Sequence, residues 1–90
     1  MTTAIGQLQP RQVATVGGDV VALTYAPRTA GPAVVVRLAD STGMVSLVFQ
    51  GRVDVPGIQP GVHLTAHGRV GTLAGMPVIF NPAYELSEEP

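Results

Sequence analysis

The segment Ala33–Phe49 restricts the possible folds more than any other part of the chain. Two valine-rich runs flank the sequence Asp40-Ser41-Thr42-Gly43. Valine favours strands, aspartate accepts hydrogen bonds from the amides that follow it, and glycine takes positive φ without steric cost. The segment therefore predicts a β-hairpin, with a loop of four residues built on a type I turn and a bulge at Gly43.

Alternation along each strand assigns the two faces of this hairpin. The residues expected to point inward are Val34, Val36 and Leu38 in the first strand and Val45, Leu47 and Phe49 in the second. Arg37 and Ser46 are poor core residues, so their face is expected to point outward. That outer face also carries Val35 and Val48.

Turn residues divide the rest of the chain into three more strand patterns, Gln12–Tyr25, Val62–Val70 and Met76–Asn81. Glycine inside a strand marks a bulge, a bend or a close backbone approach. The long first strand, with Gly17-Gly18 in its middle, is therefore expected to serve two sides of a small barrel. Loops are predicted at 26–32 and Gly71–Gly75, and Gly51–Gly61 is predicted to be a connector with one helical turn at most.

Five short strands with almost no helix predict an all-β protein. Their order, a long first strand followed by two hairpins joined by an irregular connector, fits a five-stranded antiparallel OB-fold (Greek-key) barrel with little or no helix between strands 3 and 4. An SH3-like barrel and an open five-stranded sheet are the alternatives. The expected organisation is a short, loosely ordered leader at 1–10 that could form one helical turn, the barrel at 11–86 and an acidic tail at 87–90.

Composition excludes several kinds of protein. Ninety residues suffice for one modest core, and without cysteine neither disulfides nor thiolate metal sites can form. No apolar run approaches the roughly 20 residues of a membrane helix. Met1-Thr2-Thr3-Ala4 shows neither the basic nor the apolar region of a signal peptide, so a cytoplasmic protein is expected. Only 12% of residues are charged, and the net charge of −1 gives no general attraction to nucleic acid.

Three segments carry a resemblance to a known family: Leu38–Phe49, Pro56–Val70 and Asn81–Glu85. With the residues that directly follow, the chain reads D-x-T-G-x-x-x-L-V-x-x-G-R from Asp40 to Arg52, P-G-I-x-P-G from Pro56 to Gly61, and N-P-x-Y-E-L from Asn81 to Leu86. This pattern resembles the small OB-fold nucleic-acid-binding proteins of actinobacteria, which are related to the wedge domain of RecG-type helicases and to tRNA anticodon-binding domains. The resemblance implies binding on the exposed face of strands 2 and 3 and the adjoining loops.

The resemblance points to single-stranded nucleic acid, DNA or RNA, as the ligand, bound weakly and with little sequence preference. Arginine pairs with phosphate and stacks on bases, and exposed rings supply stacking platforms. The candidate residues are Arg28, Arg37, Arg52, Arg69 and Tyr25. Tyr84 is the other ring expected to be exposed, whereas Phe49 and Phe80 are expected in the core. Each arginine could equally be a solvated residue or pair with a nearby aspartate.

The rival hypothesis is a protein-interaction or homo-oligomerisation module. Val35 and Val48, with an outward residue of Val78-Ile79, could form an apolar patch on the outer face of the sheet. Contiguous exposed apolar patches mark interaction sites. Light-scattering mass distinguishes this hypothesis from nucleic-acid binding.

Neither catalysis nor a cofactor is indicated. The sequence contains no nucleophile elbow and no phosphate-binding glycine loop, so we expect neither an enzyme nor a small-molecule substrate. His63 and His67 share one strand face, but at about 3.3 Å per residue they lie roughly 13 Å apart, too far to share a metal ion. We therefore expect two solvent-facing histidines and no metal.

Overall fold

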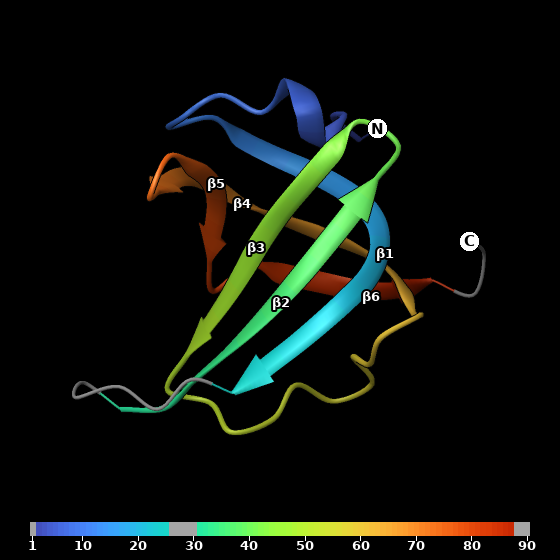
Figure 1. The fold of residues 1–90 in the computed structure, drawn as a ribbon, viewed down its shortest axis with the longest axis vertical. Helices are drawn as coiled ribbons and strands as arrows, with labels where there is room; N and C mark the ends of the chain where they lie inside the picture. The colour runs from blue at the N-terminus through green and yellow to red at the C-terminus, as the bar shows by residue number, and fades with distance from the viewer. Residues whose placement is uncertain (1, 26–30, 88–90) are drawn as a thin grey trace.

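The structure, a computed structural model, describes residues 2–25 and 31–87. A 3₁₀ turn, η1 (Ile5–Gln7), precedes the strands of a single sheet (Figure 1). The strands are β1 (Val13–Tyr25), β2 (Ala33–Asp40), β3 (Gly43–Gln50), β4 (His63–Leu73), β5 (Met76–Phe80) and β6 (Ala83–Ser87). The five predicted strands correspond to β1–β5, and β6 is additional. No helix in these ranges is long and apolar enough to cross a membrane.

The sheet closes because β1 pairs with two different strands. Its first half, from Val13 to Asp19, pairs with β4, and its second half, from Asp19 to Tyr25, pairs with β2. Gly18 lies at the crossing, where a Cβ atom would stand 2.4 Å from the carbonyl oxygen of Ala39. The prediction of a bent first strand is confirmed: the glycine allows close backbone approach, and the bulge itself lies at Val21.

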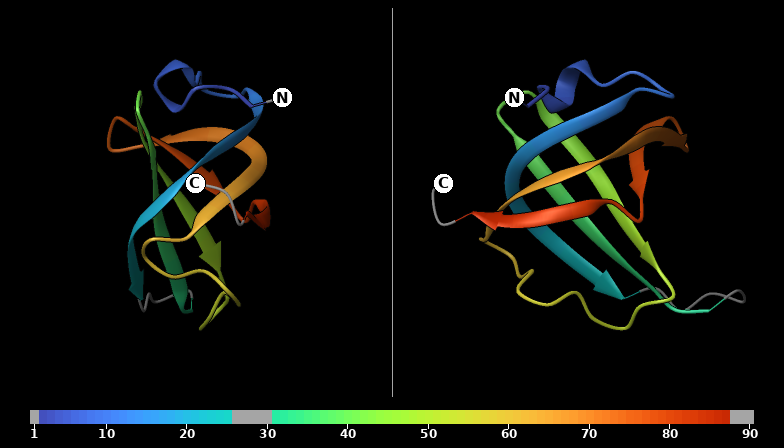
Figure 2. Two further views of the ribbon diagram at one scale, coloured as in Figure 1. Left: turned by 90° about the vertical axis from the view of Figure 1, so that its right-hand side faces the viewer. Right: turned by 180° about the vertical axis from the view of Figure 1, so that it is seen from behind.

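The remaining contacts complete the barrel, seen from three sides in Figures 1 and 2. β2 pairs with β3, and β4 pairs with β5, in antiparallel hairpins. β3 and β5 are joined by a short parallel pairing of Ser46–Val48 with Val78–Phe80. The strand order is thus β1-β2-β3-β5-β4, with β4 returning to β1 and β6 added beside β4.

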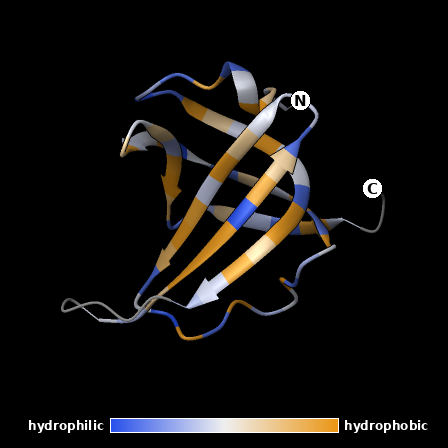
Figure 3. Ribbon diagram, in the orientation of Figure 1, coloured by the Kyte–Doolittle hydropathy of each residue, from blue (hydrophilic) through white to orange (hydrophobic). Residues whose placement is uncertain are grey.

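The core lies inside this closed sheet, and the predicted inner faces are confirmed. All six inward residues of the central hairpin are at most 1% exposed. Leu64, Ala66 and Val70 are buried from β4, and the described residues include no buried polar or charged side chain. Figure 3 shows how strongly hydrophobic residues predominate along β2 and β3. Alternating strand residues therefore account for most of the core.

The connector between β3 and β4 contains no helix, as predicted, yet it contributes to the core. It crosses the lower end of the barrel in Figure 1. Val55 and Ile58 are 4% and 3% exposed and belong to the main core cluster. Two aliphatic side chains from an irregular segment thus fill the end of the barrel.

The leader differs from the loosely ordered segment that the sequence suggested. Ile5 is 2% exposed and packs into the core at the upper end of the barrel. Its amide donates to Asp40 Oδ2 at 3.0 Å, and the Gly6 amide donates to Thr42 Oγ1 at 2.8 Å. The leader therefore covers one end of the barrel through specific bonds to the β2–β3 turn.

Both hairpin loops are shorter than predicted. Asp40 pairs directly with Gly43, so only Ser41 and Thr42 form the β2–β3 loop and Gly43 makes no bulge. Asp40 Oδ1 accepts from the Thr42 and Gly43 amides, as expected of turn aspartate. β4 continues to Leu73 beyond the predicted end at Val70, which leaves a loop of two residues, Ala74 and Gly75. Both take positive φ, 54° and 82°, as a type I′ turn requires.

Candidate nucleic-acid interface

A groove runs along the outer face of the barrel between β3 and the β4–β5 hairpin. It has a volume of about 220 Å³. Its lining consists of Arg37, Met44, Val45, Ser46, Leu73, Ala74, Met76, Pro77 and Val78. It lies on the face that the sequence predicted as the binding surface. The extension of β4 to Leu73 supplies its second wall.

Strand register places the groove's polar groups. Arg37 pairs with Ser46 across β2 and β3, and Ser46 pairs with Val78 across β3 and β5. The Arg37 guanidinium donates only a weak hydrogen bond, from Nη1 to Met44 Sδ at 3.8 Å. Within residues 2–25 and 31–87 the single contact between a basic and an acidic side chain is that of His63 with Asp19. The Arg37 guanidinium is therefore exposed, charged and free to bind an anion.

The predicted cations do not form one surface. Arg52 lies at the lower end of the barrel, with its guanidinium carbon 5.8 Å from the centre of the Phe49 ring. Arg69 lies on β4, where Nη1 donates to the Arg11 carbonyl oxygen at 3.2 Å. Arg28 lies outside the described residues. Of the predicted cations that the structure describes, only Arg37 lines the groove.

Tyr25 is exposed but is not on the outer face. It pairs with Val34, which in turn pairs with Phe49, and both of these side chains point into the barrel. Opposite residues in a sheet share a face, so Tyr25 continues the inner row at the lower end of the barrel, where it is 58% exposed. Tyr25 and Arg52 therefore share the lower end, on the other side of the sheet from Arg37.

The apolar patch predicted for self-association is largely covered. Val48 is 2% exposed and forms a small outer cluster with Ala33 and Val78, against which half-buried Val35 packs. The parallel pairing of β3 with β5 brings Val78 beside Val48, and this contact was not visible in the sequence. Val48 is thus not an exposed interaction residue.

Phe80 is an exposed ring that the sequence reading placed in the core. The β3–β5 register pairs Leu47 with Ile79 and Val48 with Phe80, so Ile79 enters the core and Phe80 stays outside, 43% exposed. Strict alternation along Met76–Phe80, starting from an inward-facing Ile79, would have assigned Phe80 to the outer face. Together with Met44, Leu73 and Met76, which are 39% to 56% exposed, Phe80 gives this side of the barrel an apolar rim.

Tyr84 is no stacking platform, in contrast to the expectation that it is exposed. Its ring meets Phe49 edge-on, with centroids 5.6 Å apart and planes at 79°. Its hydroxyl donates to the Pro56 carbonyl oxygen at 3.0 Å. Tyr84 therefore joins β6 to the connector and the core, and its half-buried ring has a structural role.

The two strand histidines have separate partners on the outer face of β1 and β4. His63 Nδ1 lies 2.9 Å from Asp19 Oδ1, and His67 Nδ1 lies 2.7 Å from Thr15 Oγ1. Both contacts follow from the β1–β4 register, which pairs Asp19 with His63 and Thr15 with His67. No group of three or more metal-binding side chains occurs in the described part of the chain.

Comparison with known proteins identifies the architecture. No protein-family profile and no curated protein sequence matches the chain. Among solved structures, it resembles the second OB-fold domain of replication protein A from Methanococcus maripaludis, with a TM-score of 0.76, 20% identity and coverage of 100% of this chain and 98% of that one. It also resembles the OB domain of MM0293 from Methanosarcina mazei, with a TM-score of 0.74, 19% identity and coverage of 99% and 84%. At these identities the likeness concerns the fold, and the chain is an OB-fold barrel.

Proposed function

We propose that this barrel is a non-enzymatic module that binds single-stranded nucleic acid in the groove between β3 and the β4–β5 hairpin. The observation that carries the proposal is the unpaired Arg37 guanidinium in a groove whose side of the barrel also exposes Phe80. A cation for phosphate and a ring for base stacking are the two elements of a single-strand site. One similar fold belongs to a protein named for replication, and the resemblance of the sequence motifs to actinobacterial OB-fold proteins is consistent with the same ligand.

The balance of groups in the groove favours weak, base-centred binding. Among the described residues that line it, Arg37 is the only charged one, and the others are apolar apart from Ser46. Each phosphate neutralised on a single strand contributes about 0.7 to the salt slope of log K, so a shallow slope is expected. Stacking of one base on a ring is worth about 1–3 kcal/mol, which makes Phe80 as important as the cation. That Arg28, Arg52 and Tyr25 contact nucleic acid stays a prediction, and it applies to a ligand long enough to extend beyond the groove.

The test is an anisotropy titration of labelled oligo-dT and oligo-U at low and moderate salt. We expect Arg37→Ala to weaken binding and to lower the salt slope by about 0.7, and Arg37→Lys to retain most of that slope. Phe80→Ala should weaken binding without changing the slope. Val53→Ala is the matched control, because Val53 is 71% exposed on the connector, away from the groove. Absence of binding at low salt would refute the proposal.

A second candidate function, self-association, is favoured by the exposed apolar side chains of Met44, Leu73, Met76 and Phe80. Exposed apolar surface of this kind occurs at protein interfaces. In that case light scattering at rising concentration would show a dimer or larger species, and Met76→Glu would return it to a monomer. A concentration-independent monomer would exclude this candidate.

A further inference from the structure

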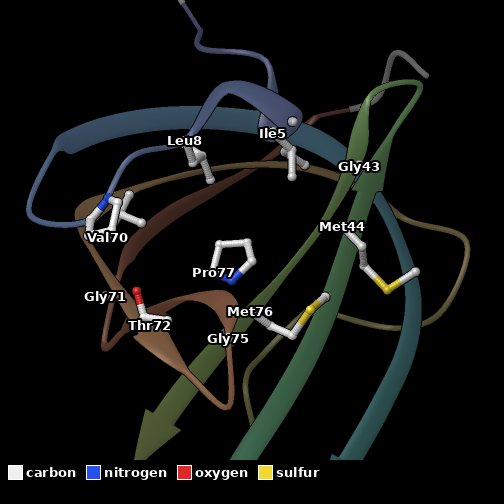
Figure 4. Close-up of a pocket in the computed structure, with 12 residues that line it drawn as sticks. Ile5, Leu8, Gly43, Met44, Val70, Gly71, Thr72, Gly75, Met76 and Pro77 are labelled. Carbon is white, nitrogen blue, oxygen red and sulfur yellow. The ribbon is translucent and has the colours of Figure 1, made fainter.

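The two ends of the groove differ in the chemistry that surrounds them. The upper end adjoins a hollow of about 440 Å³ beneath the leader, and Thr72 is the only polar side chain among the described residues that line this hollow (Figure 4). Beyond the lower end, the outer face carries two exposed amide side chains, Gln50 and Asn81, and the exposed Phe80 ring. The side chains best able to distinguish one base from another therefore lie beyond the lower end.

Strand register places Phe80 and Gln50 near each other on the outer face. Phe80 pairs with Val48 across β5 and β3. Gln50 follows Val48 by two residues on β3, so alternation keeps both side chains on the same face. Spacings of about 4.8 Å between strands and about 3.3 Å per residue put the Phe80 and Gln50 Cα atoms roughly 8 Å apart. A base stacked on the Phe80 ring therefore lies within reach of the Gln50 side chain.

Hydrogen bonds determine which end of the Gln50 amide faces outward. The Gln50 backbone N–H can only donate, and it donates to Asn81 Oδ1 at 2.8 Å. The Asn81 Nδ2 group must then face the Gln50 side chain, where it donates to Oε1 at 3.1 Å. Within residues 2–25 and 31–87 the Gln50 Nε2 group has no partner. The Gln50 side chain thus presents N–H donors to a ligand.

Asn81 is held in place by its backbone as well as by its side chain. Its amide donates to the Val48 carbonyl oxygen at 2.7 Å, directly after the parallel pairing of β3 with β5. Its φ is 51°, in the left-handed region that asparagine adopts more readily than most residues. Asn81 therefore orients the Gln50 amide from a fixed backbone position.

We infer that Gln50 selects the base that stacks on Phe80, favouring thymine or uracil over adenine, and that Asn81 is the positioning residue that sets this preference. The inference rests on the proposed function and specifies the ligand of the same face. The O4 carbonyl oxygen of thymine or uracil accepts from an N–H donor, whereas the N6 amino group of adenine is itself a donor and needs an acceptor. The acceptor of the Gln50 amide, Oε1, is already engaged by Asn81.

The experiment compares oligo-dT and oligo-dA of equal length by anisotropy, and the quantity measured is the Kd for oligo-dA divided by the Kd for oligo-dT. The same two oligonucleotides are used with every variant, so the self-stacking of oligo-dA cancels when the ratios are compared. Gln50→Glu replaces the outward donor by an acceptor. Asn81→Asp removes the Nδ2 donor, so the Gln50 amide should turn over and present Oε1 outward. We expect each variant to lower the ratio about fivefold, the equivalent of one net hydrogen bond.

Two controls separate base selection from charge and from loss of structure. Gln59→Glu makes the same change of charge on an exposed residue of the connector, and it should leave the ratio unchanged. Added negative charge weakens the binding of both oligonucleotides alike, so the ratio stays informative when overall affinity falls. In a Phe80→Ala background, Gln50→Glu should change the ratio little, because no ring then holds a base beside position 50.

The outcomes distinguish this inference from the proposed function. If Arg37→Ala weakens oligo-dT binding but Gln50→Glu and Asn81→Asp keep the ratio of the unmodified protein, base selection is wrong and the proposed function stands. An equal shift with Gln59→Glu would assign the effect to charge and also overturn base selection. A shift with Gln50→Glu alone would overturn the positioning role of Asn81. If neither oligonucleotide binds at low salt, the proposed function fails, and base selection fails with it.

Discussion

The adjacent residues Gly17 and Gly18 provide a matched pair for testing how the barrel closes. A Cβ atom on Gly18 would meet the Ala39 carbonyl oxygen at 2.4 Å and the Ala39 carbonyl carbon at 2.9 Å. A Cβ atom on Gly17 would meet nothing closer than 3.8 Å. Neither glycine has positive φ, so the two positions differ in available space and not in backbone conformation.

The expected effects of the two alanine variants have opposite signs. Alanine at position 17 should stabilise the protein by about 0.5 kcal/mol, because it restricts the unfolded chain. At position 18 the added methyl group would collide with the backbone of β2, which cannot rotate away as a side chain can. β1 would therefore have to move away from β2 at the point where β1 also pairs with β4. Such overpacking costs about 3 kcal/mol. For a domain of this size that lowers the melting temperature by about 15 °C.

Urea denaturation followed by circular dichroism measures both variants. We expect Gly17→Ala to unfold at a slightly higher urea concentration than the unmodified protein and Gly18→Ala at a much lower one. Equal stability of the two variants would refute the close approach of β1 and β2 at Gly18, and with it the proposed reason for glycine at this crossing.

Two further predictions concern the turns. Ala74→Gly should stabilise the protein by about 1 kcal/mol, because Ala74 takes positive φ in the β4–β5 turn; an unchanged urea midpoint would contradict this. For Asp40, partial burial raises the carboxyl pKa, but the hydrogen bonds from Ile5, Thr42 and Gly43 outweigh it, and the pKa lies below its ordinary value. A lowered folded-state pKa contributes stability above the unfolded pKa of about 3.9 and loses it as the pH falls through the folded value. Asp40→Asn should therefore cost about 1 kcal/mol at pH 7 and less at pH 3 in urea titrations, whereas an equal cost at both would exclude the carboxylate as the cause.

Part of the candidate site was predictable from residue alternation. The central hairpin showed that Arg37 and Ser46 face outward, and both line the groove. Alternation assigns a residue to one of two faces, but it does not show what lies next to that face. Val48 and Phe80 show the difference: both are outward, yet Val48 is covered by its neighbours and Phe80 is not.

The sequence by itself determined strands β1 to β5, most of their inner faces and the β2–β3 hairpin, because period-2 alternation and turn residues act over a few neighbouring positions. Only the tertiary structure decided the pairing of β1 with β4, the parallel contact of β3 with β5, and the burial of Ile5, Val55 and Ile58. These contacts join segments far apart in the chain, and the residues of either segment alone do not specify the partner. The groove beside Arg37 exists because of those distant pairings.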